Sequence, residues 1–432
     1  MEKSVYILAF LALFGCQEKL PESYMTYEKA LGYFAEVEEI CNLDNGKLWG
    51  SNLYGGMMFV DRATRRIIAN SPDEEGLLKR NNGVYVGILP RELLISNAPI
   101  HYGGAFFALV PLPETEDEYL IKTRTIHSLF HRFQHIKHID SRNYNTINKD
   151  ERQARLWLKL EWNALRKAIS GSGQERKLAI RDALIFRGAS REFYPSYIND
   201  ENIFENYEGL ATFTYTLLSS NSKDEYKENL FKVLDRGYVM QSYNRTYGFV
   251  HGALYAALLY DEGFNFQQID RQDFDLGEAV KELYSIELPE LCRDVAGSIA
   301  MNYDLATINA EEDKRLIEIR ESLNEQISIF TENVVRFELE SPYFDFVPES
   351  VQPLDSLGTL YNSIRISDNW GKLTVDKRGC LIANNFKSIR ISAKDFTRDR
   401  NRYSGDGWNL ILNSDWEIIV VGHNYYVRKQ MP

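Results

Sequence analysis

Two hydrophobic periods alternate along the chain and divide it into regions of different secondary structure. Residues 24–40 place aromatic and aliphatic side chains at helical spacing among glutamates, which predicts an amphipathic helix. From about residue 42 to 112, short β-rich runs such as residues 56–60 and 84–88 are separated by turns that contain glycine. This pattern predicts a small antiparallel sheet after the first helix.

The helical period returns at about residue 118 and continues to about residue 340. Short β runs broken by Gly, Asn and Asp follow in residues 341–432, which predicts a separate β domain, either a sandwich or a barrel. The sequence therefore predicts an α+β protein with an N-terminal helix and β-rich region at 17–117, a mostly helical core at 118–340 and a C-terminal β domain. Helical segments are expected at 119–138, 150–169, 174–187, 203–219, 224–235, 247–260, 276–302 and 309–338.

Residues 1–16 are typical of a lipoprotein signal peptide. The apolar run from Val5 to Phe14 has about 10 residues, half of the roughly 20 that a membrane-crossing helix needs. The run leads into Leu13-Phe14-Gly15-Cys16, which resembles the lipobox of bacterial lipoproteins, in which the cysteine is acylated and becomes the first mature residue. This resemblance implies a lipid anchor at Cys16 that attaches the protein to a membrane of the bacterial cell envelope. Gln17 after the cysteine favours the outer membrane, by resemblance to the sorting of enteric bacteria.

The composition is that of a globular protein and excludes some classes of partner. The 432 residues are 44% hydrophobic and 26% charged, which allows a sizeable buried core. A net charge of -12 argues against nucleic acid as a partner, because such binding depends on clustered Lys and Arg. Beside Cys16, the cysteines Cys41, Cys292 and Cys380 are odd in number and far apart, so the sequence predicts neither a disulfide scaffold nor a cysteine metal site.

Histidines are concentrated in one predicted helix. Five of the seven histidines lie between residues 101 and 138. His127 and His131 are one helical turn apart on the same face, so both imidazoles can bind one metal ion, and neutral imidazole suits Zn²⁺. His131 and His135 have the same spacing, so spacing alone leaves the choice of pair open. A catalytic zinc site needs a third protein ligand from elsewhere in the chain.

A later helix supplies a candidate for that third ligand. Glu208 is followed by Gly209, and a carboxylate beside a glycine can approach another helix closely because the glycine has no side chain. Glu205 lies one turn earlier and is a candidate for an outer group that holds a histidine in the correct tautomer.

Together, these two segments resemble the zinc site of the gluzincin metallopeptidases. His127-Ser128-Leu129-Phe130-His131 corresponds to their HExxH motif, and Glu208-Gly209-Leu210-Ala211 to their downstream Glu-Gly-x-Ala. The resemblance covers roughly residues 119–260 and implies a zincin-like helical core in which His127, His131 and Glu208 hold zinc.

Ser128 is the departure from this pattern. It stands where gluzincins have the glutamate that takes a proton from zinc-bound water, and a serine hydroxyl cannot replace a carboxylate as general base. Glu161, Glu205 and His135 are the candidates for a substitute base.

Further residues are candidates for less central roles. Arg124 and Gln134 lie within one turn of the histidine pair and are expected to line the cleft, although Arg124 suits a surface ion pair equally well. His251 lies on an apolar helix and is expected to be a buried, hydrogen-bonded histidine. The C-terminal aromatics, including Trp370 and Trp408, suit either a binding face or a sandwich core.

These observations lead to three functional hypotheses. The first is a zinc metallopeptidase-like lipoprotein with weak or absent activity, because the general base is missing at Ser128. The second is a binding or scaffolding lipoprotein that keeps a zincin-like fold without catalysis and takes a peptide or protein as its ligand. The third is an active metallopeptidase that uses another base.

Overall fold

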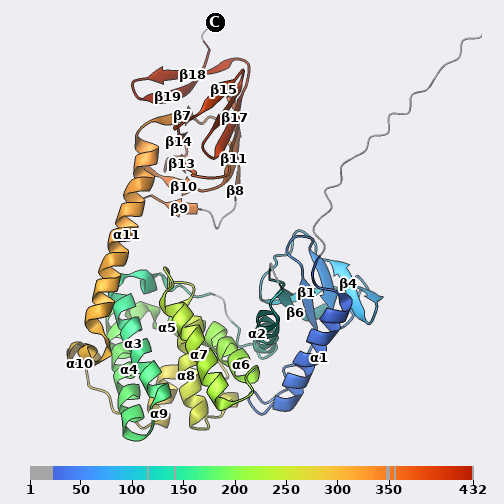
Figure 1. The fold of residues 1–432 in the computed structure, drawn as a ribbon, viewed down its shortest axis with the longest axis vertical. Coiled ribbons are helices and arrows are strands. Elements are labelled where there is room, and N and C mark those ends of the chain that lie inside the picture. The colour runs from blue at the N-terminus through green and yellow to red at the C-terminus, as the bar shows by residue number, and fades with distance from the viewer. Residues whose placement is uncertain (1–22, 114–115, 141–142, 347–350, 355–356, 431–432) are drawn as a thin grey trace, which may run out of the picture. The chain divides into compact units, whose positions relative to one another are not determined.

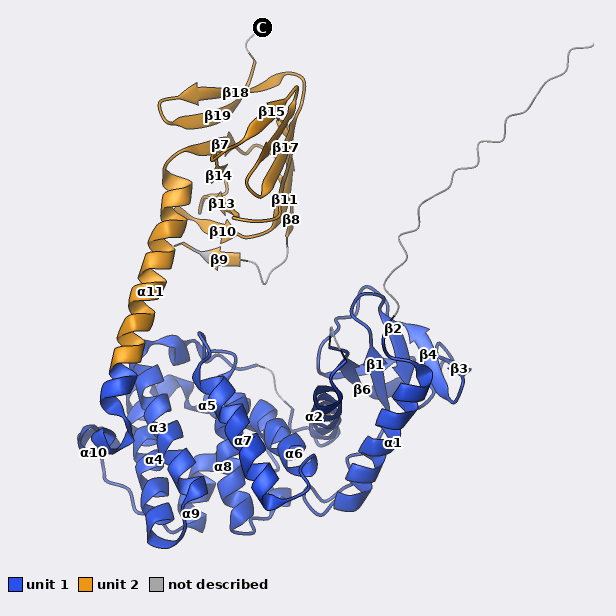
Figure 2. Cartoon of the chain, viewed as in Figure 1, with its two compact units in different colours: residues 1–309 blue, residues 310–432 orange. Residues whose placement is uncertain are grey.

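The chain forms two compact units, residues 1–309 and residues 310–432 (Figure 2). The computed structural model describes residues 23–430 except 114–115, 141–142, 347–350 and 355–356. Cys16 and the expected signal peptide therefore lie outside the described residues. Both units contain helices and strands, so the protein is of the α+β class that the sequence predicts.

The first unit begins with a helix and a six-stranded sheet (Figure 1). Helix α1 (Tyr27–Asp44) is capped by the side chain of Thr26, which accepts from Lys29 N. The strand order is β3-β4-β2-β1-β6-β5. The strands are β1 (Met57–Val60), β2 (Arg66–Ala69), β3 (Lys79–Asn81), β4 (Val84–Ile88), β5 (Pro99–Tyr102) and β6 (Ala105–Pro111).

The expectation that this sheet is purely antiparallel is wrong at its centre. Strands β1 and β6 run parallel, with Phe59 opposite Val110, while the other pairs in the sheet are antiparallel. Parallel neighbours cannot be joined by a tight turn, and here the rest of the sheet separates them in sequence. The alternation of apolar and polar residues within a strand does not show whether that strand runs parallel or antiparallel to a strand far away in the sequence.

Helices make up the rest of the first unit. Helix α2 (Glu118–Ile136) contacts strand β6 and helix α6, so it joins the sheet to the helical core. The other α-helices are α3 (Arg152–Ser170), α4 (Gly173–Phe193), α5 (Ile198–Phe204), α6 (Leu210–Leu218), α7 (Lys223–Tyr238), α8 (Tyr247–Asp261), α9 (Leu276–Leu283) and α10 (Cys292–Ile299). The shorter turns are η1 (Ile147–Asp150), η2 (Pro195–Tyr197), η3 (Glu205–Gly209), η4 (Phe266–Gln268) and η5 (Ala300–Tyr303).

Three of the expected helices are shorter or interrupted. The segment at 276–302 breaks after Leu283, where Ser285 has a φ of 49° and ends the helical path. The segment at 203–219 contains η3, a five-residue π-helical stretch. Helix α11 (Leu305–Thr331) ends before Asn333, whose φ is 50°.

The second unit contains the end of α11 and two sheets. Strand β7 (Val334–Glu338) pairs with β14, so strand structure begins ahead of residue 341. One sheet has the order β18-β19-β7-β14-β13-β10-β9 and the other β15-β16-β17-β12-β11-β8. The remaining strands are β8 (Tyr343–Phe346), β9 (Val351–Pro353), β10 (Thr359–Tyr361), β11 (Ile364–Asp368), β12 (Gly371–Val375), β13 (Cys380–Ile382), β14 (Ser388–Ser392), β15 (Thr397–Asp399), β16 (Arg402–Gly405), β17 (Trp408–Leu412), β18 (Trp416–Val421) and β19 (Asn424–Lys429).

One buried cluster joins these two sheets. Ile389 of one sheet and Leu410 of the other are both fully buried in it, as expected for a sandwich. Trp370 and Trp408 belong to this cluster, so these two aromatics pack in the core and do not form a binding face.

Three cysteines in the described part of the chain are free and buried: Cys41 in α1, Cys292 in α10 and Cys380 in β13. Burial raises the pKa of Cys41 to about 12 and that of Cys292 to about 11, and it raises the pKa of Cys380 further.

Within the described ranges, none of the helices combines the length and the apolar character needed to span a membrane.

Candidate metal centre

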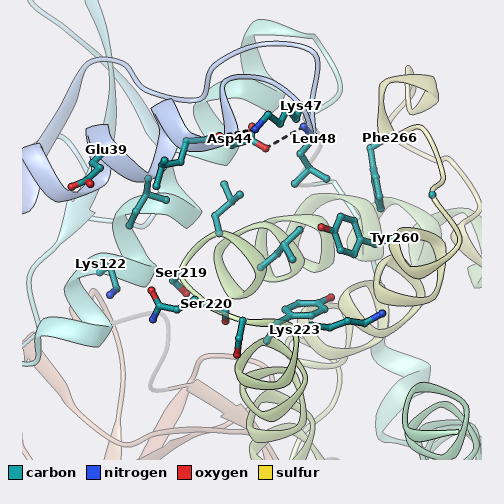
Figure 3. Close-up of a pocket in the computed structure, with 18 of the residues that line it drawn as sticks. Glu39, Asp44, Lys47, Leu48, Lys122, Ser219, Ser220, Lys223, Tyr260 and Phe266 are labelled. Carbon is teal, nitrogen blue, oxygen red and sulfur yellow. Dashed lines mark hydrogen bonds between the residues drawn. The ribbon is translucent and has the colours of Figure 1, made fainter.

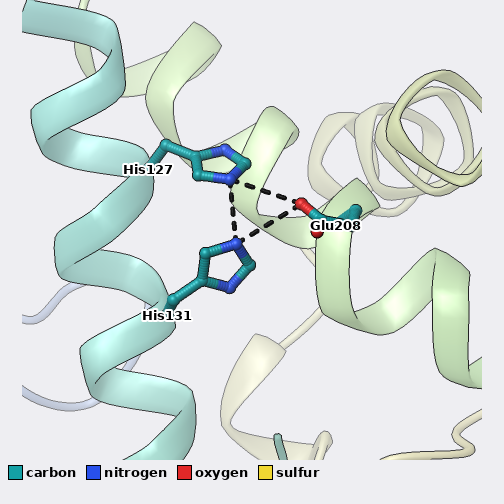
Figure 4. A group of neighbouring side chains, drawn as sticks. All are labelled: His127, His131 and Glu208. Carbon is teal, nitrogen blue, oxygen red and sulfur yellow. Dashed lines mark hydrogen bonds and ion pairs between the residues drawn. The ribbon is translucent and has the colours of Figure 1, made fainter. Parts of the chain in front are cut away.

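Helix α2 places two histidines on one buried face. His127 and His131 are both buried, and their Nε2 atoms lie 2.8 Å apart. Their rings meet nearly at right angles, with an interplanar angle of 86°, so the two nitrogens converge while the rings avoid each other (Figure 4).

The π-helical stretch η3 brings Glu208 to the two histidines. Oε2 of Glu208 lies 3.3 Å from Nε2 of His127 and 3.3 Å from Nε2 of His131 (Figure 4). The turn packs against α8 through two glycines: a Cβ atom on Gly209 would lie 2.5 Å from Cα of Gly252. Side chains at these positions would push the helices apart, which is the role expected of the glycine after Glu208. Single π-turns inside α-helices are frequent at functional sites.

The distances among the three ligand atoms fit a tetrahedral zinc ion. Tetrahedral ligand atoms about 2.05 Å from one zinc ion, the usual length of Zn–N and Zn–O bonds, would lie about 3.3 Å from one another. The separations here are 2.8, 3.3 and 3.3 Å, so only a small spreading of the two histidines would be needed. In catalytic zinc sites with three protein ligands, a water molecule or the substrate is the fourth ligand.

Gln134 fixes the tautomer of His131. Its Nε2 donates to the carbonyl oxygen of Asn206 at 2.9 Å, and a carbonyl can only accept, so the amide orientation is determined. Oε1 of Gln134 then faces Nδ1 of His131 at 2.8 Å and accepts its proton. Nε2 of His131 is thereby left as a lone pair directed at Glu208. Outer hydrogen bonds of this kind orient metal-binding histidines.

The electrostatics of the group call for a cation. Oε2 of Glu208 is buried and accepts no hydrogen bond from any described residue. Burial raises the pKa of Glu208, but the two histidines outweigh it and bring this pKa to about 2. Burial and the neighbouring His131 lower the pKa of His127, so its imidazole stays neutral at neutral pH, as a metal ligand must. A carboxylate oxygen beside two imidazole nitrogens, of which Gln134 leaves that of His131 as a lone pair, suits a cation.

Ser128 is held by the sheet. It is fully buried, and its hydroxyl lies 3.0 Å from the carbonyl oxygen of Leu109 on β6 and 2.5 Å from Oδ1 of Asn97. One hydroxyl proton cannot serve both acceptors, so the Asn97 amide must turn its NH₂ toward the serine. Ser128 therefore fastens α2 to the sheet.

None of the three candidate bases lies with the metal ligands. Glu205 forms a bidentate pair with Arg187, and Glu161 lies 3.0 Å from Nε2 of His251. His135 pairs with Asp140 at 2.8 Å. The structure therefore brings together His127, His131 and Glu208 but leaves the proposed bases in other contacts.

Two other expectations have clear outcomes. Arg124 donates to the carbonyl oxygen of Pro111 at 3.2 Å, so it holds the end of β6. His251 is buried and accepts from Nε1 of Trp162 at 3.0 Å, which confirms it as a satisfied core histidine.

Sequence reasoning did not find the partners of the histidines. Gln134 was expected in the cleft wall, and Glu205, not Gln134, was the candidate for the group that fixes a tautomer. The sequence did hold one signal for Gln134: it follows His131 by three residues, a spacing at which two side chains on a helix lie close enough to interact. The rings of Tyr215 and Phe249 flank His127, with centroids 5.9 and 6.2 Å from it, and come from helices that spacing could not relate to α2.

A larger groove lies elsewhere in the first unit (Figure 3). Its volume is about 880 Å³, and none of the three metal ligands lines it. Lys122 in its wall already pairs with Glu36 at 3.1 Å, and Asp44 caps the turn at Gly46 and Leu48. The groove is therefore separate from the group of His127, His131 and Glu208.

Comparison of the chain with protein-family models, with curated proteins and with solved structures gives no match. The functional argument therefore rests on the residues of the site.

Proposed function

We propose that this protein is a cell-envelope lipoprotein with a zincin-like core that binds one zinc ion through His127, His131 and Glu208. The main support is the geometry of these three ligand atoms, together with the tautomer of His131 that Gln134 imposes. Bound zinc would lower the pKa of a water in the fourth position and polarise a carbonyl group. The ligand that we propose for the protein is a peptide or a protein segment, as the resemblance to metallopeptidases implies.

Peptide hydrolysis by this site is weak or absent. A general base typically contributes about 10² to 10⁴ in rate, and Ser128 cannot supply it because its hydroxyl is bound to Leu109 and Asn97. Glu161 and Glu205 are engaged with His251 and Arg187, so neither is free to replace it. The protein therefore acts chiefly by binding.

Metal content and hydrolysis together test this proposal. The purified full chain, reconstituted at neutral pH, should hold close to one zinc ion, measured by elemental analysis. Its cleavage of a peptide library should be no faster with zinc than with a chelator, and a His127→Ala variant supplies the background rate. Wild-type protein without zinc would remove the proposal and leave a scaffolding role. Rapid, chelator-sensitive cleavage would show instead that another base operates.

The lipid anchor at Cys16 is a separate part of the proposal and is supported by the Leu13-Phe14-Gly15-Cys16 motif. Replacing Cys16 with alanine should abolish labelling by a fatty-acid analogue and release the protein from the membrane fraction, because the lipid is the expected anchor. The same measurement on Cys41→Ala, a buried thiol, should give wild-type labelling. Wild-type protein that is unlabelled and soluble would contradict the anchor.

A further inference from the structure

A buried arginine holds the turn that carries Glu208. Arg187 of α4 donates from Nη1 to Oε1 of Glu205 at 3.0 Å and from Nη2 to Oε2 at 2.8 Å. Glu205 opens η3, three residues before Glu208. Both residues of the pair are buried, and a bidentate arginine–carboxylate pair fixes orientation as well as distance.

Arg187 is itself tightly confined. Nη2 lies 3.4 Å from Oδ1 of Asp275, and a Cβ atom on Gly277 would lie 2.6 Å from Nε of Arg187. Helix α9 thus packs directly on the guanidinium group. The guanidinium cannot move without displacing α9 or releasing Glu205.

Further ion pairs extend from Arg187 into a network of charged groups. Arg191 contacts Asp275 and Glu201, and Nζ of Lys149 lies 2.5 Å from Oε1 of Glu201. His251 also lies in this network, with Nε2 3.0 Å from Oε1 of Glu161 and 2.8 Å from Nη1 of Arg187. The linked carboxylates are Glu161, Glu201, Glu205 and Asp275, and the linked cations are Lys149, Arg187 and Arg191.

We propose that Arg187 is a positioning residue of the metal centre. Through Glu205 it holds η3 in the π-helical form that directs Oε2 of Glu208 at the two histidines. This inference rests on the proposed zinc binding and adds a residue that does not touch the metal.

The test compares two arginines of the same helix. Arg176 also lies on α4 and also pairs with a carboxylate, Asp261 at 2.9 Å, but it is about three turns from Arg187. Arg187→Met should raise the Kd for zinc by about 10- to 100-fold, the range typical of residues that support metal ligands. Arg176→Met should leave the Kd within about threefold of wild type, since this variant keeps the contact of Arg187 with Glu205 that supports η3. The Kd is measured by competition with a chromophoric chelator.

The visible spectrum of bound Co²⁺ supplies a readout that a general loss of stability would not change. Arg187→Met should alter the cobalt bands, because Glu208 is displaced, and Arg176→Met should reproduce the wild-type bands. If Arg187→Met does not fold, Glu205→Gln keeps the shape of the side chain, removes its charge and should raise the Kd about tenfold.

Three results would overturn the inference. These are a wild-type Kd and spectrum in Arg187→Met, an unchanged Kd in Glu205→Gln, and an equal loss of affinity in Arg176→Met. Failure of the wild-type protein to bind zinc would instead refute the proposed function, so the two failures are distinguishable.

Discussion

Replacing His131 with alanine is expected to weaken zinc binding by more than about 100-fold. Zinc sites built from protein ligands bind with about 10–16 kcal/mol, so loss of one ligand among three costs about 3 kcal/mol or more. His131 is fully buried, and Tyr207 stacks on its ring with centroids 4.1 Å apart, so both nitrogens and the orientation of the ring are fixed by the surroundings. Titration of the apo protein against a competing chelator gives the affinity.

Two further variants make this result specific. His135→Ala changes the same residue type on the same helix and should leave zinc affinity unchanged, because His135 pairs with Asp140. The zinc affinity of Gln134→Leu should lie between those of His131→Ala and His135→Ala, about 10- to 100-fold below wild type. This substitution removes only the group that fixes the tautomer of His131. If His135→Ala were as damaging as His131→Ala, the metal would be bound by the other histidine pair.

Acid is expected to remove about 3 kcal/mol of stability from the first unit through Glu201 alone. Burial raises the pKa of Glu201, but Lys149, Arg191 and Arg187 outweigh it and lower this pKa from 4.5 to about 2. A carboxyl group with a lowered pKa in the folded state stabilises the fold above its unfolded pKa and loses this contribution as the pH falls through the folded value. The free energy of unfolding should therefore fall between about pH 4.5 and pH 2.

Urea unfolding at several pH values measures this loss. Chelator must be present throughout, because zinc also leaves in acid and would add its own pH dependence. Glu201→Gln should be less stable than wild type at pH 7. Its free energy of unfolding should fall by about 3 kcal/mol less than that of wild type between about pH 4.5 and pH 2. A matched change at Glu175, which is exposed in the first turn of α4, should leave the curve close to that of wild type. An identical pH profile in wild type and Glu201→Gln would contradict the prediction.

Local sequence signals predicted most of the helices and the shared face of the histidine pair, for a physical reason. One helical turn separates His127 from His131, so their shared face follows from α-helical geometry alone. Pairing them with Glu208 needed the resemblance to a known motif, because no local period relates α2 to η3. Spacing alone left open whether His127 or His135 is the partner of His131; the resemblance favoured His127, and in the structure His127 faces Glu208.

Features that depend on long-range packing were not predictable. Three features depend on contacts between segments that are distant in sequence. They are the parallel pairing of β1 with β6, the π-helical form of η3 and the ion network around Arg187. A buried arginine and a surface arginine look alike in a single sequence, and so do a serine that binds water and one that binds a strand. Ser128 shows the difference: its residue type was known to be unsuited to catalysis, but its bond to Leu109 was not.

The buried cysteines give each region of the protein its own reporter of local opening. Only the thiolate reacts with thiol reagents, and the raised pKa values of Cys41 and Cys292 leave almost none of it at neutral pH while the fold is closed. Labelling must then wait for the surrounding structure to open, so its rate reports the free energy of that opening. Because Cys41 lies beside the sheet, Cys292 in the helical core and Cys380 in the β sandwich, one labelling experiment can rank the three regions by how often they open.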